Sequence, residues 1–95
     1  MSSLEWEMGY RYIALAAREK YADNSTIYQL WGLPSTKREW HHDPLAFIEK
    51  IDKKWRLTIY NEQGFQQERG AYKTLKEAKA MGIALVTMEG IKHAV

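Results

Sequence analysis

The chain has 95 residues, of which 45% are hydrophobic and 27% charged, with a formal net charge of +2 and no cysteine. This length predicts one domain, and this balance of residues argues against disorder. The missing cysteines exclude disulfide bonds and thiolate metal sites, and no apolar run approaches the roughly 20 residues of a membrane span. So small a net charge does not by itself indicate a nucleic-acid-binding protein. The acidic N-terminus lacks the basic segment of a signal peptide, so we expect a cytoplasmic protein without membrane attachment.

The first third of the chain predicts a hairpin. Apolar and polar residues alternate between Leu4 and Tyr12, although the residues that follow would also suit a helical turn or two. We favour a strand over residues 9–17. Residues 23–25 form a turn cluster, and Thr26–Trp31 is rich in β-forming residues, so this segment predicts the second strand.

The second half of the chain predicts three strands after a long irregular stretch. The candidates are Ala46–Ile51, residues 55–60 and residues 65–72. Alternation in the middle strand separates two faces. One face carries Trp55, Leu57 and Ile59, and the other carries Arg56, Thr58 and Tyr60.

A helix is predicted after the last strand. Thr74 precedes Glu77 by three residues, which is the spacing of a capping box, and Gly90 is placed to end the helix in a left-handed conformation. An apolar stripe follows three- and four-residue steps, and we expect its first four members to face the sheet. The stripe comprises Leu75, Ala78, Gly82, Leu85 and Met88, with Met81 beside it.

Together these elements predict an α+β fold, with an antiparallel sheet of four to five strands and one C-terminal helix packed across one face. We expect a single domain over residues 1–95. It divides into an N-terminal hairpin (1–33), a loop (34–44) and a unit of three strands plus helix (45–95).

A junction motif in the second half carries a family resemblance. A tryptophan-containing middle strand precedes a Gly-x-aromatic-x-Thr-x-x-Glu-Ala sequence, here formed by Trp55, Gly70, Tyr72, Thr74, Glu77 and Ala78. Residues 46–90 thereby resemble the three-strand-plus-helix DNA-binding module of AP2 domains and of the arm-binding domains of tyrosine integrases. In that family the sheet face opposite the helix enters the major groove. The resemblance implies that this face binds nucleic acid through Lys53, Lys54, Arg56, Thr58, Tyr60, Gln67 and Arg69.

Other chemistry is not indicated by the sequence. Arg56, Thr58 and Tyr60 are also typical of a solvated face in any two-layer domain. The chain has no Gly-rich phosphate loop, no nucleophile elbow and no evident carboxylate pair, so we predict neither an enzyme nor a cofactor. His41 and His42 have too few companions for a tetrahedral metal site, so we predict a loop surface there and no metal.

Trp40 lies in the polar segment KREWHHD and has two interpretations. It could be a lid over an open edge of the core, which we slightly favour, or an exposed anchor for a protein partner.

Two functions follow for the chain. The first is a small non-catalytic protein that binds nucleic acid through the sheet face. The alternative is a phage- or mobile-element-type accessory protein that binds and modulates a host protein, with Lys37, Arg38 and Trp40 at the interface.

Overall fold

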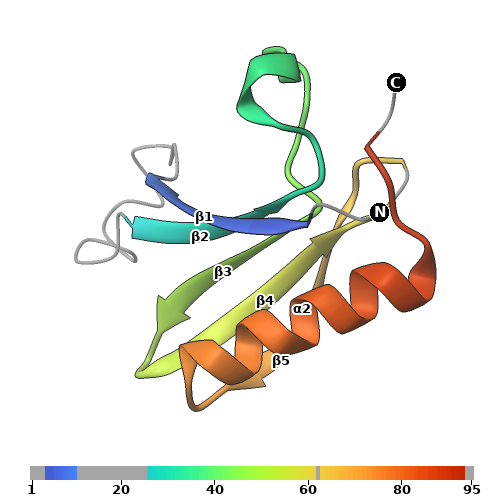
Figure 1. The fold of residues 1–95 in the computed structure, drawn as a ribbon. Coiled ribbons are helices and arrows are strands. Elements are labelled where there is room, and N and C mark those ends of the chain that lie inside the picture. Colours follow the sequence, from blue (N-terminus) through green and yellow to red (C-terminus); the bar gives the residue numbers. More distant parts are fainter. Residues whose placement is uncertain (1–3, 11–25, 62, 94–95) are drawn as a thin grey trace.

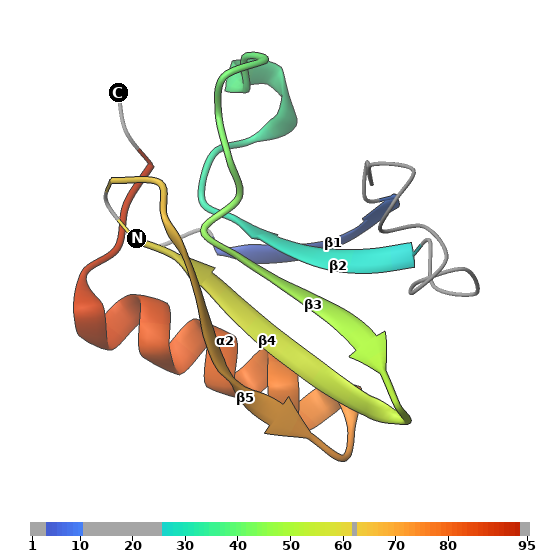
Figure 2. The ribbon, with the colours of Figure 1, turned by 180° about the vertical axis from the view of Figure 1, so that it is seen from behind.

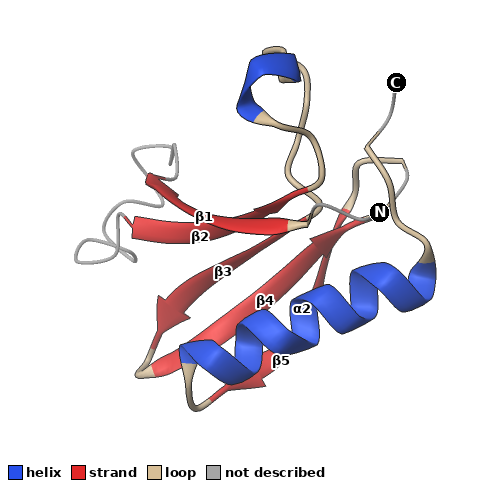
Figure 3. Cartoon of the chain, in the orientation of Figure 1, coloured by secondary structure: helices blue, strands red, loops and turns tan. Residues whose placement is uncertain are grey.

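The computed structural model describes residues 4–10, 26–61 and 63–93 (Figure 1). Within them, five strands form one sheet in which every neighbouring pair is antiparallel. The strands lie in sequence order: β1 (Glu5–Tyr10), β2 (Thr26–Trp31), β3 (Ala46–Ile51), β4 (Lys54–Tyr60) and β5 (Gln66–Tyr72). Among the same residues, one α-helix, α2 (Leu75–Glu89), covers one face of the sheet, which confirms the predicted α+β fold (Figure 3).

The strand boundaries follow the predicted ones closely after the first strand. The second and third strands begin and end where the sequence predicts, and β4 and β5 each differ by one residue at the start. The first strand is different, because β1 occupies residues 5–10 where we predicted 9–17. Residues 11–17 lie outside the described residues, so that part of the prediction has no counterpart here.

The core lies between the sheet and α2. Leu57 and Ile59 of β4 are buried against Ala78 and Val86 of the helix, as the alternation predicts, whereas Trp55 is only half-buried at the margin of this core. Within the described residues, the α2 positions that are buried follow four-residue steps through Ala78, Gly82 and Val86. Leu75 and Leu85 pack against the core as partly buried side chains, while Met88 is 80% exposed and does not belong to the sheet-facing stripe.

Both ends of α2 follow the predicted capping chemistry. The Oγ1 atom of Thr74 accepts a hydrogen bond from the Glu77 N–H at 3.1 Å. Gly90 ends the helix with φ of 64°, a left-handed conformation that glycine adopts without steric cost. The sequence therefore determines where this helix begins and ends.

A contact between Trp6 and α2 ties the N-terminal hairpin to the helix. The indole N–H of Trp6 donates to the backbone carbonyl of Lys79 at 3.2 Å. A Cβ atom at Gly82 would lie 2.6 Å from the Trp6 ring, so only glycine allows this approach. The outermost strand β1 is thus held against the helix through Trp6.

The sheet has two ends of different character. One end, called the loop end here, consists of residues 33–45, residue 61, residues 63–65 and residues 91–93 (Figure 2). The other, called the lysine end, consists of the β3–β4 turn (residues 50–54) and the β5–α2 junction with the first part of the helix (residues 73–79). The strand β3 runs from one end to the other.

No helix in the described ranges has the length and apolar character needed to span a bilayer.

Candidate functional site

The sheet face opposite the helix carries a buried ion pair. Glu49 faces Arg56 across β3 and β4 and is only 2% exposed. The Arg56 Nε donates to Glu49 Oε1 at 3.1 Å, and Nη2 contacts the same oxygen. A second carboxylate oxygen, Oε2 of Glu68, lies 4.0 Å from Arg56 Nη1. The arginine that we expected to meet phosphate is therefore held between two carboxylates.

The neighbours of Arg56 on this face are also largely covered. Thr58 is 5% exposed, and Tyr60 is half-buried with its ring 5.7 Å from that of Phe47. A hollow of about 240 Å³ lies over this part of the face, lined in part by Glu49, Arg56 and Thr58. The alternation of β4 is as predicted, but the face is not the open polar surface that the sequence suggests.

Gln67 and Arg69 lie on the other side of the sheet, so their predicted placement beside Arg56 is wrong. Gln67 pairs with the core residue Ile59, and residues directly opposite each other in a sheet share a face. The Arg69 guanidinium makes two contacts to the Glu89 carboxylate of α2, at 2.8 and 2.7 Å. The hydrogen bond from Arg69 lowers the pKa of Glu89. A register shift between Arg56 and Thr58 means that alternation in β4 alone does not fix the faces of β5.

Lys53 and Lys54 lie at the lysine end, at the edge of the predicted surface. Asp52 and Lys53 form the two-residue connection between β3 and β4, with φ values of 51° and 66°. Both lysines are exposed. The structure therefore separates these two lysines from Arg69 and brings only part of the predicted nucleic-acid site together.

Trp40 is 96% exposed, so the favoured interpretation as a lid over the core is wrong. It lies with His41 at the tip of a tight turn. The His42 N–H donates to the Glu39 carbonyl at 3.0 Å, and the Glu39 N–H donates to His42 Nδ1 at 2.9 Å. The His42 ring thus helps to close the turn that points Trp40 outward.

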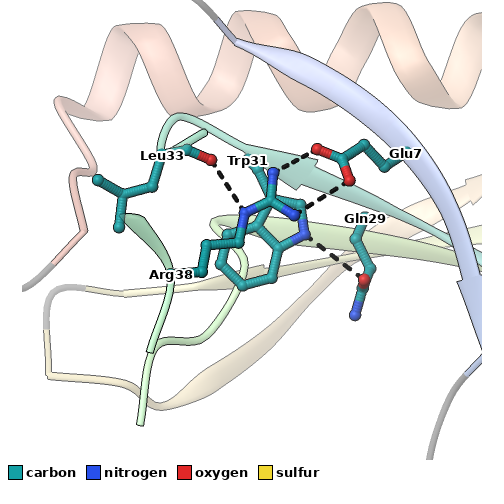
Figure 4. A network of polar contacts seen from close by, with 5 residues as sticks. All are labelled: Glu7, Gln29, Trp31, Leu33 and Arg38. Atoms are coloured by element: carbon teal, nitrogen blue, oxygen red, sulfur yellow. Dashed lines mark hydrogen bonds and ion pairs between the residues drawn. The ribbon is translucent and has the colours of Figure 1, made fainter. Parts of the chain in front are cut away.

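Arg38 anchors this loop to the sheet (Figure 4). Its Nε donates to the Leu33 carbonyl at 2.9 Å, and its two terminal nitrogens bind both carboxylate oxygens of Glu7 on β1. The guanidinium also lies over the Trp31 ring, 4.1 Å from its centroid. The hydrogen bond from Arg38 lowers the pKa of Glu7. Of the predicted interface residues, Arg38 is therefore a brace for the loop, whereas Lys37 and Trp40 are exposed.

A pocket of about 210 Å³ lies beside the loop where it meets the C-terminal segment. His42 and His93 line it, and the His93 ring stacks on Trp31 at 5.3 Å between centroids. Burial lowers the pKa of His93, with smaller contributions from the charges of His42 and Arg38. No group of three or more His, Cys, Asp or Glu side chains suited to a metal ion occurs in the ranges that the structure describes.

No family model, no curated protein and no solved structure matches this chain. The likeness to the AP2 and integrase modules therefore stays a prediction.

Proposed function

We propose that this chain is a non-catalytic binding protein whose loop end contacts a protein partner, with Trp40 as the anchor. The observation that carries the proposal is the 96% exposure of Trp40 at the tip of a hydrogen-bonded turn. A tryptophan side chain buries about 150–250 Å² when covered, and leaving it in water forgoes that stabilisation. Tryptophan is also among the residues that most often dominate binding energy at protein interfaces.

The way the loop is held supports the same proposal. Arg38 is fixed by Leu33, Glu7 and Trp31, so the residues after it leave the sheet from a rigid base. The turn between Glu39 and His42 is closed by two further hydrogen bonds. A contact residue presented in this way loses less conformational entropy on binding.

The sheet face carries less support for the first of our two functions, nucleic-acid binding. Arg56 is engaged by Glu49 and Glu68, which would have to give way to phosphate. Glu68 is exposed and would itself repel phosphate. Modulation of a host protein by a phage- or mobile-element-type accessory protein is one case of the proposed protein contact.

The test compares Trp40→Ala with Met88→Ala, a matched control that shortens another exposed apolar side chain, on α2. Proteins that co-purify with the tagged wild-type chain from nuclease-treated lysate are identified, and the binding of each purified candidate is then measured. We expect Trp40→Ala to weaken the true partner by about 30-fold or more, corresponding to the roughly 2 kcal/mol of an interface hot spot. Met88→Ala should bind like the wild type. Equal affinities for the wild type and Trp40→Ala would refute the proposal, provided that both unfold at the same temperature.

A further inference from the structure

Arginine and lysine are used differently in this fold. Within the described residues each arginine binds a carboxylate: Arg38 binds Glu7, Arg56 binds Glu49 and Arg69 binds Glu89. None of the eight lysines in the same part of the chain takes part in an ion pair. Among the described residues, the arginine charges are thus neutralised by carboxylates, whereas the lysine charges are not.

Six of these lysines gather at the lysine end: Lys50, Lys53, Lys54, Lys73, Lys76 and Lys79. The strand pairing brings them together, because Trp55 of β4 lies directly opposite Tyr72 of β5. The two segments that carry them contain only two carboxylates, Asp52 and Glu77. All of the six except Lys79 are exposed. The result is a local excess of positive charge that the small net charge of the whole chain conceals.

Aromatic rings hold two of the lysines in place. The Lys79 ammonium lies over the Tyr28 ring at 4.6 Å, and the Lys50 ammonium lies 5.4 Å from the centroid of the Trp55 ring. Tyr28 and Trp55 in turn pack edge to face, with centroids 6.0 Å apart. These rings are part of the packed sheet surface and are covered by ammonium groups, so they do not offer open faces on which bases could stack.

We infer that the lysine end binds the phosphate backbone of duplex nucleic acid without reading its sequence. Phosphates form a dense line of negative charge, and unpaired lysines release condensed counterions when they bind it. Sequence readout in the major groove depends mostly on bidentate side chains such as arginine, and the described arginines are bound to carboxylates. Single-strand binding would require free aromatic faces, which the described rings Tyr28 and Trp55 do not offer. The inference is independent of the proposed contact through Trp40, which lies at the opposite end of β3.

The backbone at Lys53 gives separate support. The β3–β4 connection is a two-residue turn with positive φ at both positions, where Asn-Gly or Asp-Gly is the usual choice. Lysine in the second position carries a conformational cost that glycine would avoid. A strained position that keeps a long cationic side chain at the apex of a hairpin is consistent with a use for that charge.

An acidic protein surface is the competing partner, and two features disfavour it. Lysine is depleted at protein interfaces, whose centres are usually aromatic or apolar. The segments 50–54 and 73–79 carry no exposed large hydrophobic residue that could serve as such a centre.

The experiment measures binding of a fluorescent mixed-sequence DNA duplex of about 20 base pairs as a function of salt. The variant Lys53→Gln/Lys54→Gln is compared with Lys37→Gln/Lys92→Gln, which removes the same charge from two exposed lysines at the loop end. We expect the first pair to weaken binding about tenfold or more at ~50 mM salt and to reduce the slope of log K against log salt by about 2. The second pair and Trp40→Ala should bind duplex like the wild type.

Four results would overturn the inference. They are no binding of duplex by the wild type at low salt, equal losses in the two lysine pairs, tighter binding of single-stranded than of duplex DNA, and binding of polyglutamate in place of DNA. The last result would assign the lysine end to an acidic protein. Circular dichroism of each variant confirms that the fold is intact, so a loss of binding reports on the surface.

Discussion

The loop end and the lysine end of the sheet differ in which side chains they bind within the fold and which they leave in solvent. At the loop end the cation Arg38 is bound inside the molecule, and an aromatic residue, Trp40, is exposed. At the lysine end the aromatic residues Tyr28 and Trp55 are packed, and the cations are exposed. This difference underlies our two proposals, a protein contact at the loop end and a polyanion at the lysine end.

The choice between arginine and lysine underlies this difference. A guanidinium presents several donors in a planar fork, so one side chain can bind a carboxylate, a carbonyl and an aromatic face together, as Arg38 does. An ammonium is a compact, strongly hydrated point charge that loses less by remaining in water. Among the described residues, arginine therefore braces the elements and lysine stays at the surface.

The prediction with the largest expected effect tests whether the two ends unfold as one cooperative unit. Leu57 is fully buried between them, beneath α2. Leu57→Ala should lower the free energy of unfolding by about 2–5 kcal/mol, since it removes core contacts and leaves a cavity. Urea denaturation measures this loss, and duplex binding and partner binding should fall together as the protein unfolds. A loss at one end alone would show that the ends are separate cooperative units.

A reciprocal pair of exchanges sharpens the contrast between arginine and lysine. Arg38→Lys keeps the charge but loses the fork that binds Glu7 and Leu33, so we expect a loss of about 1–2 kcal/mol. Lys54→Arg at the lysine end should change stability by less than about 0.5 kcal/mol, because the exposed lysine has no partner to lose. Denaturant midpoints of the two variants give the comparison. Equal effects would mean that the brace at Arg38 contributes no stability.

The fold was predictable because its signals are local. The cap residues Thr74 and Gly90 act within a few residues of themselves, and the alternation of β4 is visible in the strand alone. The helix face was less predictable, since Val86, not Met88, completes the buried row. That outcome depends on where α2 leaves the sheet, which no local pattern records.

The candidate sites were less predictable because they depend on how strands pair and on which segments the fold brings together. The face of Gln67 follows from its pairing with Ile59, and the register between β4 and β5 then shifts between Arg56 and Thr58; the sequence marks neither feature. The exposure of Trp40 follows from a turn closed by the His42 side chain. The sequence pointed to Lys53 and Lys54, but their four companions join them only when the two segments are brought to one end of the sheet.

Part of the pH dependence of stability should arise at the loop end, where His93 lies. Burial lowers the pKa of His93 at the loop end, so the folded state disfavours its protonation relative to the unfolded state. The stability that neutral His93 contributes is therefore fully present above the ordinary histidine pKa of about 6.5, and it is lost as pH falls through the lowered pKa of the folded state. His93→Gln should remove this part of the pH dependence, and thermal unfolding of both proteins between about pH 7 and pH 5 measures it. Identical pH profiles would show that His93 does not carry the effect.

A glycine at position 53 is expected to have a small effect of the opposite sign. Lys53→Gly relieves a left-handed backbone at φ of 66° but makes the unfolded chain more flexible. The first effect exceeds the second, so we expect a gain of about 0.5–1 kcal/mol in the free energy of unfolding. The same change removes a cation from the lysine end and should weaken duplex binding, with a salt slope smaller by about 1. A variant that is more stable and binds duplex less well would separate the use of this lysine from the needs of the fold. If Lys53→Gly is more stable and binds duplex like the wild type, Lys53 makes no phosphate contact, and the strain at this turn has no explanation in binding.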